Sequence, residues 1–160
     1  MTCKKCKEKP VIKLTNSHIT LCKKCFTNYF EKKVKKTIRN HKLFKKGDKV
    51  GVALSGGKDS LTTLHILNKI AKQQRTTKLV AITIDEGIKG YRDKTLTFAK
   101  KYCKENDIEL HIASYKETFG KKLDSIVKKT DTIPCSICGV FRRYLLNSKA
   151  KELKVNRLAT

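Results

Sequence analysis

The sequence predicts an α/β fold with a parallel sheet, preceded by a small cysteine-rich region that carries a basic helix. Three observations support this prediction. After residue 47, short β-branched apolar runs alternate with amphipathic stretches of helical period, as in parallel strands joined by helices. The first 46 residues contain four of the seven cysteines and a lysine-rich helical pattern. Gly47 and Asp48 interrupt the pattern, so we expect domains at 1–46 and 47–160.

The first region should contain two short extended segments and one helix. Segments 11–14 and 18–21 are rich in β-prone residues and lie between two cysteine pairs. From about 26 to 46, apolar residues recur every four positions with lysines between them, which predicts an amphipathic helix. The apolar residues are Phe26, Phe30, Val34 and Ile38, and the lysines are Lys32, Lys33, Lys35 and Lys36.

The second region should contain four strands and four helices. The expected strands are 49–54, 79–84, 108–113 and one beginning near 155, and the expected helices are 59–73, 91–106, 119–129 and 139–153. The apolar stripe of the first of these helices is formed by Leu61, Leu64, His65, Leu67 and Ile70. Because the chain ends within an apolar run, we expect this domain to be truncated, with an incomplete sheet.

The charge balance favours a polyanionic partner. The chain has 38 Lys and Arg against 14 Asp and Glu, a net charge of +24. Residues 1–48 alone hold 15 basic and 3 acidic residues, and this clustering favours nucleic acid over a generally lysine-rich composition. No apolar run approaches the ~20 residues of a membrane span, and the N-terminus is unlike a secretory signal. A cytoplasmic protein with no membrane partner is therefore expected.

The N-terminal cysteines have the spacing of a structural zinc site. Two Cys-x-x-Cys pairs are separated by 15 residues, and each pair can present two sulfurs to one ion. So short a segment buries little apolar surface, so Zn²⁺ would supply its folding free energy. The predicted ligands are Cys3, Cys6, Cys22 and Cys25. His18 lies in the spacer and is a possible substitute ligand.

A glycine-containing loop between a predicted buried strand and a helix predicts phosphate binding. Two glycines allow a tight turn and bring backbone N–H groups close to phosphate oxygens, while the helix N-terminus adds partial positive charge. A lysine and two hydroxyls add polar contacts, and an aspartate is available to orient Mg²⁺. The loop residues are Ser55, Gly56, Gly57, Lys58, Asp59 and Ser60. The spacing differs from that of a Walker A loop.

This segment, SGGKDS after an apolar strand, resembles the PP-loop of the ATP-pyrophosphatase superfamily. The resemblance implies a Rossmann-like domain that splits ATP between its α- and β-phosphates and transfers AMP to a substrate oxygen. It also implies that the backbone of Ala53 and Leu54 contacts adenosine. Residues that end the second strand, Ile84 and Asp85 with Glu86, should line the same pocket, although a solvated loop is the alternative for the two acids.

A second cysteine pair narrows the resemblance. The segment PCSICGVFRR places Cys135 and Cys138 near a helix start and two arginines, which favours thiolates. It resembles tRNA 2-thiolation enzymes of the TtuA and NcsA type and, more distantly, the TtcA type. That resemblance implies an iron–sulfur cluster, 4Fe–4S, held by this pair and a third cysteine further along, with Arg142 near the nucleotide. The third cysteine is absent from this sequence, and Cys103 is expected to be a core residue.

These patterns together predict a tRNA uridine 2-sulfurtransferase that adenylates the uridine 2-oxygen and then inserts sulfur. The resemblance implies tRNA and a sulfur donor as partners, and the donor typical of the family is a ubiquitin-like thiocarboxylate carrier. It also implies a homodimer. A redox dithiol or a second zinc site remains an alternative for the second cysteine pair. For the whole chain, the alternatives are an adenylating ligase of the lysidine-synthetase kind and a non-catalytic RNA-binding module.

Overall fold

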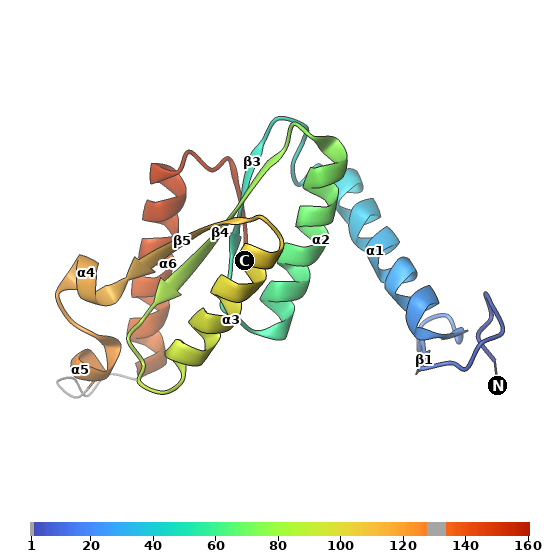
Figure 1. Cartoon of the computed structure of the whole chain (residues 1–160), viewed down its shortest axis with the longest axis horizontal. Coiled ribbons are helices and arrows are strands. Elements are labelled where there is room, and N and C mark those ends of the chain that lie inside the picture. Colours follow the sequence, from blue (N-terminus) through green and yellow to red (C-terminus); the bar gives the residue numbers. More distant parts are fainter. Residues whose placement is uncertain (1, 128–133) are drawn as a thin grey trace. The chain divides into compact units, whose positions relative to one another are not determined.

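The computed structural model describes residues 2–127 and 134–160, and the side chains of residues 127, 134 and 135 lie outside this description. The chain forms two compact units, Met1–Phe44 and Lys45–Thr160, each with its own elements (Figure 1). The division lies close to the predicted break at Gly47. Among the described helices, none is long and apolar enough to cross a membrane.

The first unit is a two-stranded ribbon followed by a helix. Strand β1 (Ile12–Lys13) pairs antiparallel with β2 (Thr20–Leu21), and α1 spans Lys23–Asn40. The helix begins three residues earlier than predicted, because Cys22 adopts extended dihedral angles and its carbonyl accepts the N–H of Phe26 at 2.8 Å. It also ends before the predicted residue 46, since the backbone of Lys42 has a φ of 49°.

The second unit is built on a four-stranded parallel sheet, as predicted. Its strands are β3 (Lys49–Ala53), β4 (Lys78–Asp85), β5 (Glu109–Ser114) and β6 (Arg157–Ala159). They lie in the order β5-β4-β3-β6, and each neighbouring pair is parallel. The central strands β3 and β4 are buried along most of their length. All carboxyl ends therefore lie at one edge, where an open α/β sheet binds its ligands.

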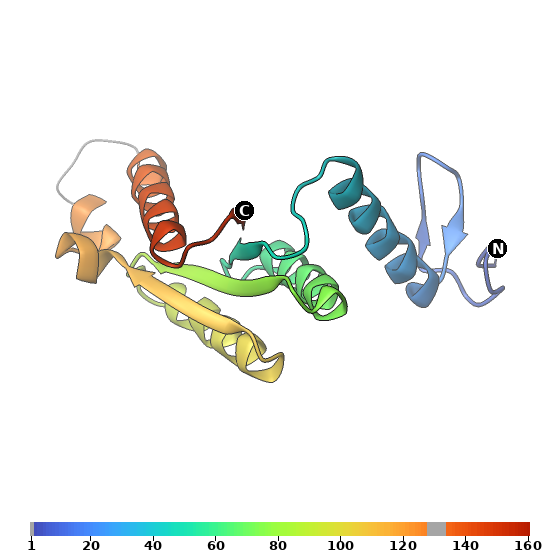
Figure 2. The ribbon, with the colours of Figure 1, turned by 90° about the horizontal axis from the view of Figure 1, so that it is seen from above.

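Helices cover both faces of this sheet. Right-handed connections place α2 (Lys58–Gln74) and α3 (Arg92–Glu105) on one face, and α6 (Pro134–Glu152) lies on the other (Figure 2). The apolar face of α2 is buried as predicted, except that His65 is exposed and its Nδ1 lies 3.0 Å from the hydroxyl of Tyr102. The polar ring is thus held at the edge of the helix interface.

The segment between β5 and α6 differs from the prediction. A single helix over 119–129 is wrong: α4 (Tyr115–Phe119) and α5 (Leu123–Val127) are separate short helices. Gly120 ends α4 with a φ of 69°, in the left-handed region where glycine carries no Cβ penalty. Helix α6 begins at Pro134 rather than 139, which fits the preference of proline for the first turn of a helix.

Candidate functional site

The four N-terminal cysteines come together in the first unit. Their sulfur atoms all lie within 4.8 Å of one another, and this is the group among the described side chains that could hold a metal. A tetrahedral Zn–S distance of 2.3 Å requires sulfurs roughly 3.8 Å apart, and the Sγ of Cys6 lies 3.4 Å from that of Cys22 and 3.6 Å from that of Cys25. The four sulfurs therefore fit one tetrahedral ion. His18 lies in an exposed turn outside this group.

Local backbone structure holds the two cysteine pairs in place and favours the thiolate at Cys3. The first pair lies in a tight turn closed by the N–H of Lys7 on the carbonyl of Cys3 at 2.9 Å, while the second pair begins α1. Burial opposes ionisation of Cys3, but hydrogen bonds from neighbouring backbone groups, first that of Cys22, outweigh it and lower the pKa to about 6. A thiolate held by backbone donors is the form that ligates zinc.

The phosphate loop connects β3 to α2 in the second unit. The hydroxyl oxygens of Ser55 and Ser60 lie 3.0 Å apart, and Ser55 Oγ also accepts the N–H of Gly57 at 3.3 Å. No side chain caps the N-terminus of α2, so its first N–H groups point out of the loop. Lys58 and Asp59 are exposed and form an ion pair at 3.2 Å. Such a helix end has the geometry of an anion site.

A pocket of about 540 Å³, including its open mouth, lies beside this loop. Its lining comes from the carboxyl ends of β3 and β4, from the start of α3 and from α6. Six residues that were expected at the site line it: Ala53, Leu54, Ser55, Ile84, Glu86 and Arg142. Ile88, shortly after β4, also lines it, and so do residues that were not expected there, namely Ile82, Tyr91, Arg92 and Leu146. The carboxylate of Asp85 instead accepts the N–H of Gly87 at 2.9 Å, which shapes the turn after β4.

Glu86 and two arginines form the charged wall of the pocket. Glu86 is 3% exposed, and its two carboxylate oxygens each lie 2.9 Å from the Nε of a different arginine, Arg92 and Arg142. Arg92 is also buried and donates to the carbonyl oxygens of Ser55 and Ile84. Sequence reasoning missed Arg92, because arginine is normally exposed and no motif marks its burial.

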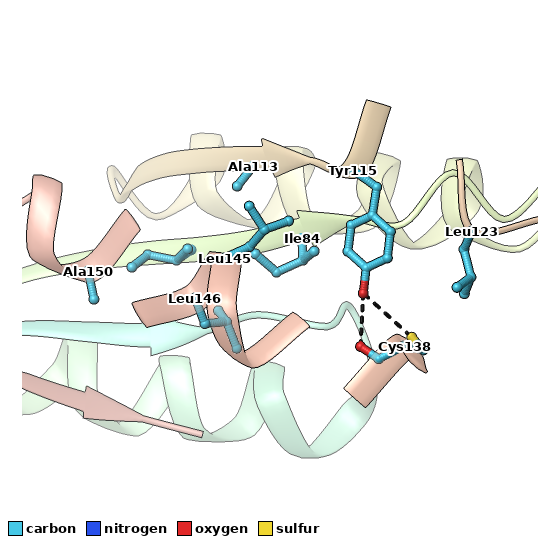
Figure 3. Close-up of a cluster of buried hydrophobic side chains, with 9 residues drawn as sticks. Ile84, Ala113, Tyr115, Leu123, Cys138, Leu145, Leu146 and Ala150 are labelled. Atoms are coloured by element: carbon cyan, nitrogen blue, oxygen red, sulfur yellow. Dashed lines mark hydrogen bonds between the residues drawn. The ribbon is translucent and has the colours of Figure 1, made fainter. Parts of the chain in front are cut away.

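Cys138 lies at the other end of this charged wall, in the first turns of α6. Its Sγ accepts a hydrogen bond from Nη2 of Arg142 at 3.2 Å. The hydroxyl of Tyr115 donates to the carbonyl oxygen of Cys138 at 2.9 Å and lies 3.7 Å from its sulfur (Figure 3). Burial raises the pKa of Tyr115, so the phenol remains a donor. The Arg142 guanidinium thus contacts the sulfur, while the Tyr115 hydroxyl holds the backbone of the same residue.

Of the second cysteine pair, the structure describes the side chain of Cys138 alone. The backbone of Cys135 belongs to the first turn of α6, but its side chain lies outside the described part of the chain. Cys103 is 2% exposed on α3, and burial raises its pKa to about 11. It lies on the opposite face of the sheet from α6, so it does not reach Cys138 (Figure 2). It is a core residue, as predicted.

Comparison with known proteins agrees with this geometry. The sequence profile of the PP-loop domain matches residues 26–132. The chain belongs to the PP-loop family. A second profile, the N-terminal LIM domain of the 2-thiouridine synthetase TtuA, matches residues 2–27, which include the four clustered cysteines. The PP-loop fold and the N-terminal cysteine unit predicted from the sequence are thereby confirmed.

Among known proteins, this PP-loop chain is similar to tRNA thiolation proteins. It is 40% identical over 158 residues to the cytoplasmic tRNA 2-thiolation protein 1 of Drosophila sechellia, and 37% identical over 161 residues to that of Xenopus laevis. The solved U34-tRNA thiolase NcsA of Methanococcus maripaludis, with its [4Fe-4S] cluster, is 40% identical and superimposes with a TM-score of 0.89.

The PP-loop chain is nearly completely covered by these matches but spans about half the length of the relatives. The alignments cover 98%, 99% and 99% of the chain, and 46%, 47% and 52% of the Drosophila, Xenopus and Methanococcus proteins respectively. The aligned part of this chain includes its cysteine cluster, its phosphate loop and its Cys138 helix.

Proposed function

We propose that this chain carries the nucleotide-binding and sulfur-site residues of an ATP-dependent tRNA uridine 2-thiolation enzyme. One observation carries the proposal: Ser55 of the phosphate loop and Arg142, which contacts the Cys138 sulfur, line the same pocket, with Glu86 and Arg92 between them. An adenylation site next to a sulfur site is what successive activation and thiolation require. The similarity to thiolation proteins along nearly the full chain supports the same assignment.

In the first step, ATP would occupy the pocket with its phosphates at the loop. The backbone of Ala53 and Leu54 would contact adenosine, and the N–H groups at the start of α2 together with Lys58 would bind the β- and γ-phosphates. Asp59 is placed to orient a phosphate-bound Mg²⁺. The uridine 2-oxygen attacks the α-phosphorus, the α–β bridge breaks, and pyrophosphate leaves with its charge stabilised by the loop.

In the second step, a sulfur nucleophile attacks carbon 2 of the activated uridine and AMP leaves with the original oxygen. Arg142 lines the pocket and would stabilise the α-phosphate of the leaving AMP. Cys138, buried and hydrogen-bonded to Arg142, fits a thiolate ligand, and with Cys135 it would hold a 4Fe–4S cluster. When bound, such a cluster supplies an iron that carries the incoming sulfur.

The first unit would hold one structural Zn²⁺ and contact RNA. Four thiolates close the coordination sphere, so no position is left for catalysis. Lysines on the exposed side of α1 provide charge for phosphate contacts, among them Lys32, Lys33 and Lys36. The wobble uridine is the proposed target, because NcsA is described as a U34-tRNA thiolase. A thiocarboxylate carrier as sulfur donor and a homodimer belong to the same proposal.

Measuring pyrophosphate release tests the adenylation step. The chain, incubated with Mg·ATP and unmodified tRNA, should release pyrophosphate in a tRNA-dependent reaction and retain AMP on the RNA. A lysidine-type ligase would require an amino acid for product formation, and a non-catalytic RNA-binding module would bind tRNA without using ATP. Failure to bind ATP at all would overturn the proposed function.

A further inference from the structure

Glu86 does more than line the pocket, because its two carboxylate oxygens form ion pairs with different helices, α3 and α6. One oxygen contacts Arg92, which donates to the Ser55 carbonyl oxygen in the phosphate loop at 3.0 Å. The other oxygen contacts Arg142, which donates to the Cys138 sulfur in α6 at 3.2 Å. Each contact along this path is 3.2 Å or shorter, so the path from the loop to the sulfur is continuous.

The two arginines differ in how firmly the protein holds them. The side chain of Arg92 is 6% exposed and is fixed by acceptors on β4, among them Thr83 Oγ1 at 2.9 Å, in addition to Ser55. The side chain of Arg142 is 49% exposed, and its guanidinium donates hydrogen bonds to Glu86 and to Cys138. A long side chain with that exposure has many rotamers, and ordering it costs conformational entropy. Glu86 is therefore the rigid anchor for Arg142.

Charge balance supports the same role. The buried carboxylate is neutralised by Arg92, so Arg142 contributes an additional positive charge beside the pocket and the sulfur. One cation thus contacts the Glu86 carboxylate and the Cys138 sulfur and also lines the pocket.

We propose that Glu86 is a positioning residue that couples the nucleotide pocket to the Cys138 helix by holding Arg142 between them. The inference rests on the proposed function, since it takes ATP as the ligand of the pocket. It makes a specific statement beyond that function: Glu86 acts through Arg142, so the contribution of Glu86 to nucleotide binding depends on the presence of Arg142.

A double-mutant cycle on ATP affinity tests this dependence. Titration calorimetry with Mg·ATP is carried out on the parent chain, Glu86→Gln, Arg142→Met and the double variant. Glu86→Gln should weaken binding about tenfold in the parent, the size of one lost charge-assisted hydrogen bond, and less than about twofold in the Arg142→Met background. Glu105→Gln is the matched control: it breaks the exposed Lys101–Glu105 pair on α3 and should leave affinity unchanged.

A second readout follows the sulfur end of the path. Bound ATP should slow alkylation of Cys138, measured by peptide mass spectrometry, in the parent chain and to a smaller extent in Glu86→Gln. If removing Glu86 unfolds the chain, as seen by circular dichroism, Glu86→Asp replaces it in both measurements, because the shorter acid keeps the charge but shifts Arg142. Equal loss of affinity on both backgrounds would overturn the coupling. A parent chain that fails to bind ATP would instead overturn the proposed function.

Discussion

A Cβ atom added at Gly56 would lie 2.7 Å from the backbone carbonyl oxygen of Thr95. The phosphate loop is therefore in direct contact with α3, at a distance that only glycine permits. Gly56 also has a φ of 85°, in the left-handed region. The loop conformation and the position of α3 thus depend on the same residue.

Substituting this glycine should destabilise the second unit and impair ATP binding together. Gly56→Ala combines a left-handed strain of about 1–2 kcal/mol with an overpacking cost of about 1–3 kcal/mol against Thr95. Gly90→Ala is the matched control, since Gly90 has a φ of 78° but nothing within 4 Å of an added Cβ. Urea unfolding should show the larger loss for Gly56→Ala. Equal losses would mean that the contact with Thr95 is relaxed at no cost.

The hydroxyl of Tyr115 should contribute to the stability of the Cys138 turn. Tyr115→Phe removes the donor to the Cys138 carbonyl, which is buried, and should lower the free energy of unfolding by about 1 kcal/mol. Tyr144→Phe removes a hydroxyl from a side chain that is 57% exposed and should change it by less than about 0.5 kcal/mol. Urea denaturation of both variants gives the comparison, and similar losses would argue against this hydrogen bond.

Much of the fold could be predicted because local patterns agreed with it. The runs at 49–54 and 79–84 are apolar on both faces of the chain, as buried parallel strands require. Boundaries depended on single backbone events that composition does not reveal. The left-handed residues Lys42 and Gly120 ended helices that the apolar periodicity continued.

The candidate site likewise contains residues that could be predicted from the sequence and residues that could not. The phosphate loop and the N-terminal cysteine pairs are short contiguous motifs, so a turn suited to phosphate and a cluster of four cysteines could be predicted from the sequence. Arg92 could not, because its role arises from acceptors in the phosphate loop and on β4 that meet it only in the folded sheet. The partnership of Glu86 with Arg142 spans 56 residues and likewise depends on α6 lying across the ends of the strands.

Zinc should be needed for the first unit and not for the second. The chain purified under reducing conditions should contain one zinc per molecule, and Cys22→Ser should lose it, whereas Cys103→Ala should retain it. An apparent zinc binding energy of about 10–16 kcal/mol exceeds what the small core of this unit supplies. Chelation should therefore remove the dispersed amide resonances of residues 2–40 in NMR spectra and leave those of the sheet. Unchanged spectra without metal would contradict a zinc-dependent fold.

Lys58 should act on nucleotide binding without affecting stability. Its side chain is 89% exposed and pairs with Asp59, a surface contact that contributes little to folding. Lys58→Ala should lower ATP affinity and tRNA-dependent pyrophosphate release at least about tenfold, by loss of a charge-assisted phosphate contact. Lys101→Ala removes a lysine from α3 whose side chain is 73% exposed, and it should change neither quantity. A parent-like ATP affinity in Lys58→Ala would remove this lysine from the phosphate site.

Cys103 should give the chain an alkaline sensitivity that its replacement removes. Burial raises its pKa from 9.0 to about 11, so the folded state holds this proton more tightly than the unfolded state. The resulting stabilisation is complete below pH 9 and is lost as the pH rises from about 9 to about 11. Cys103→Ala should be less stable at pH 7 because of the cavity, but the difference from the parent should narrow across that window. Urea unfolding at pH 7, 9 and 10.5 measures it. A constant difference would mean that the thiol ionises as readily in the core as in water.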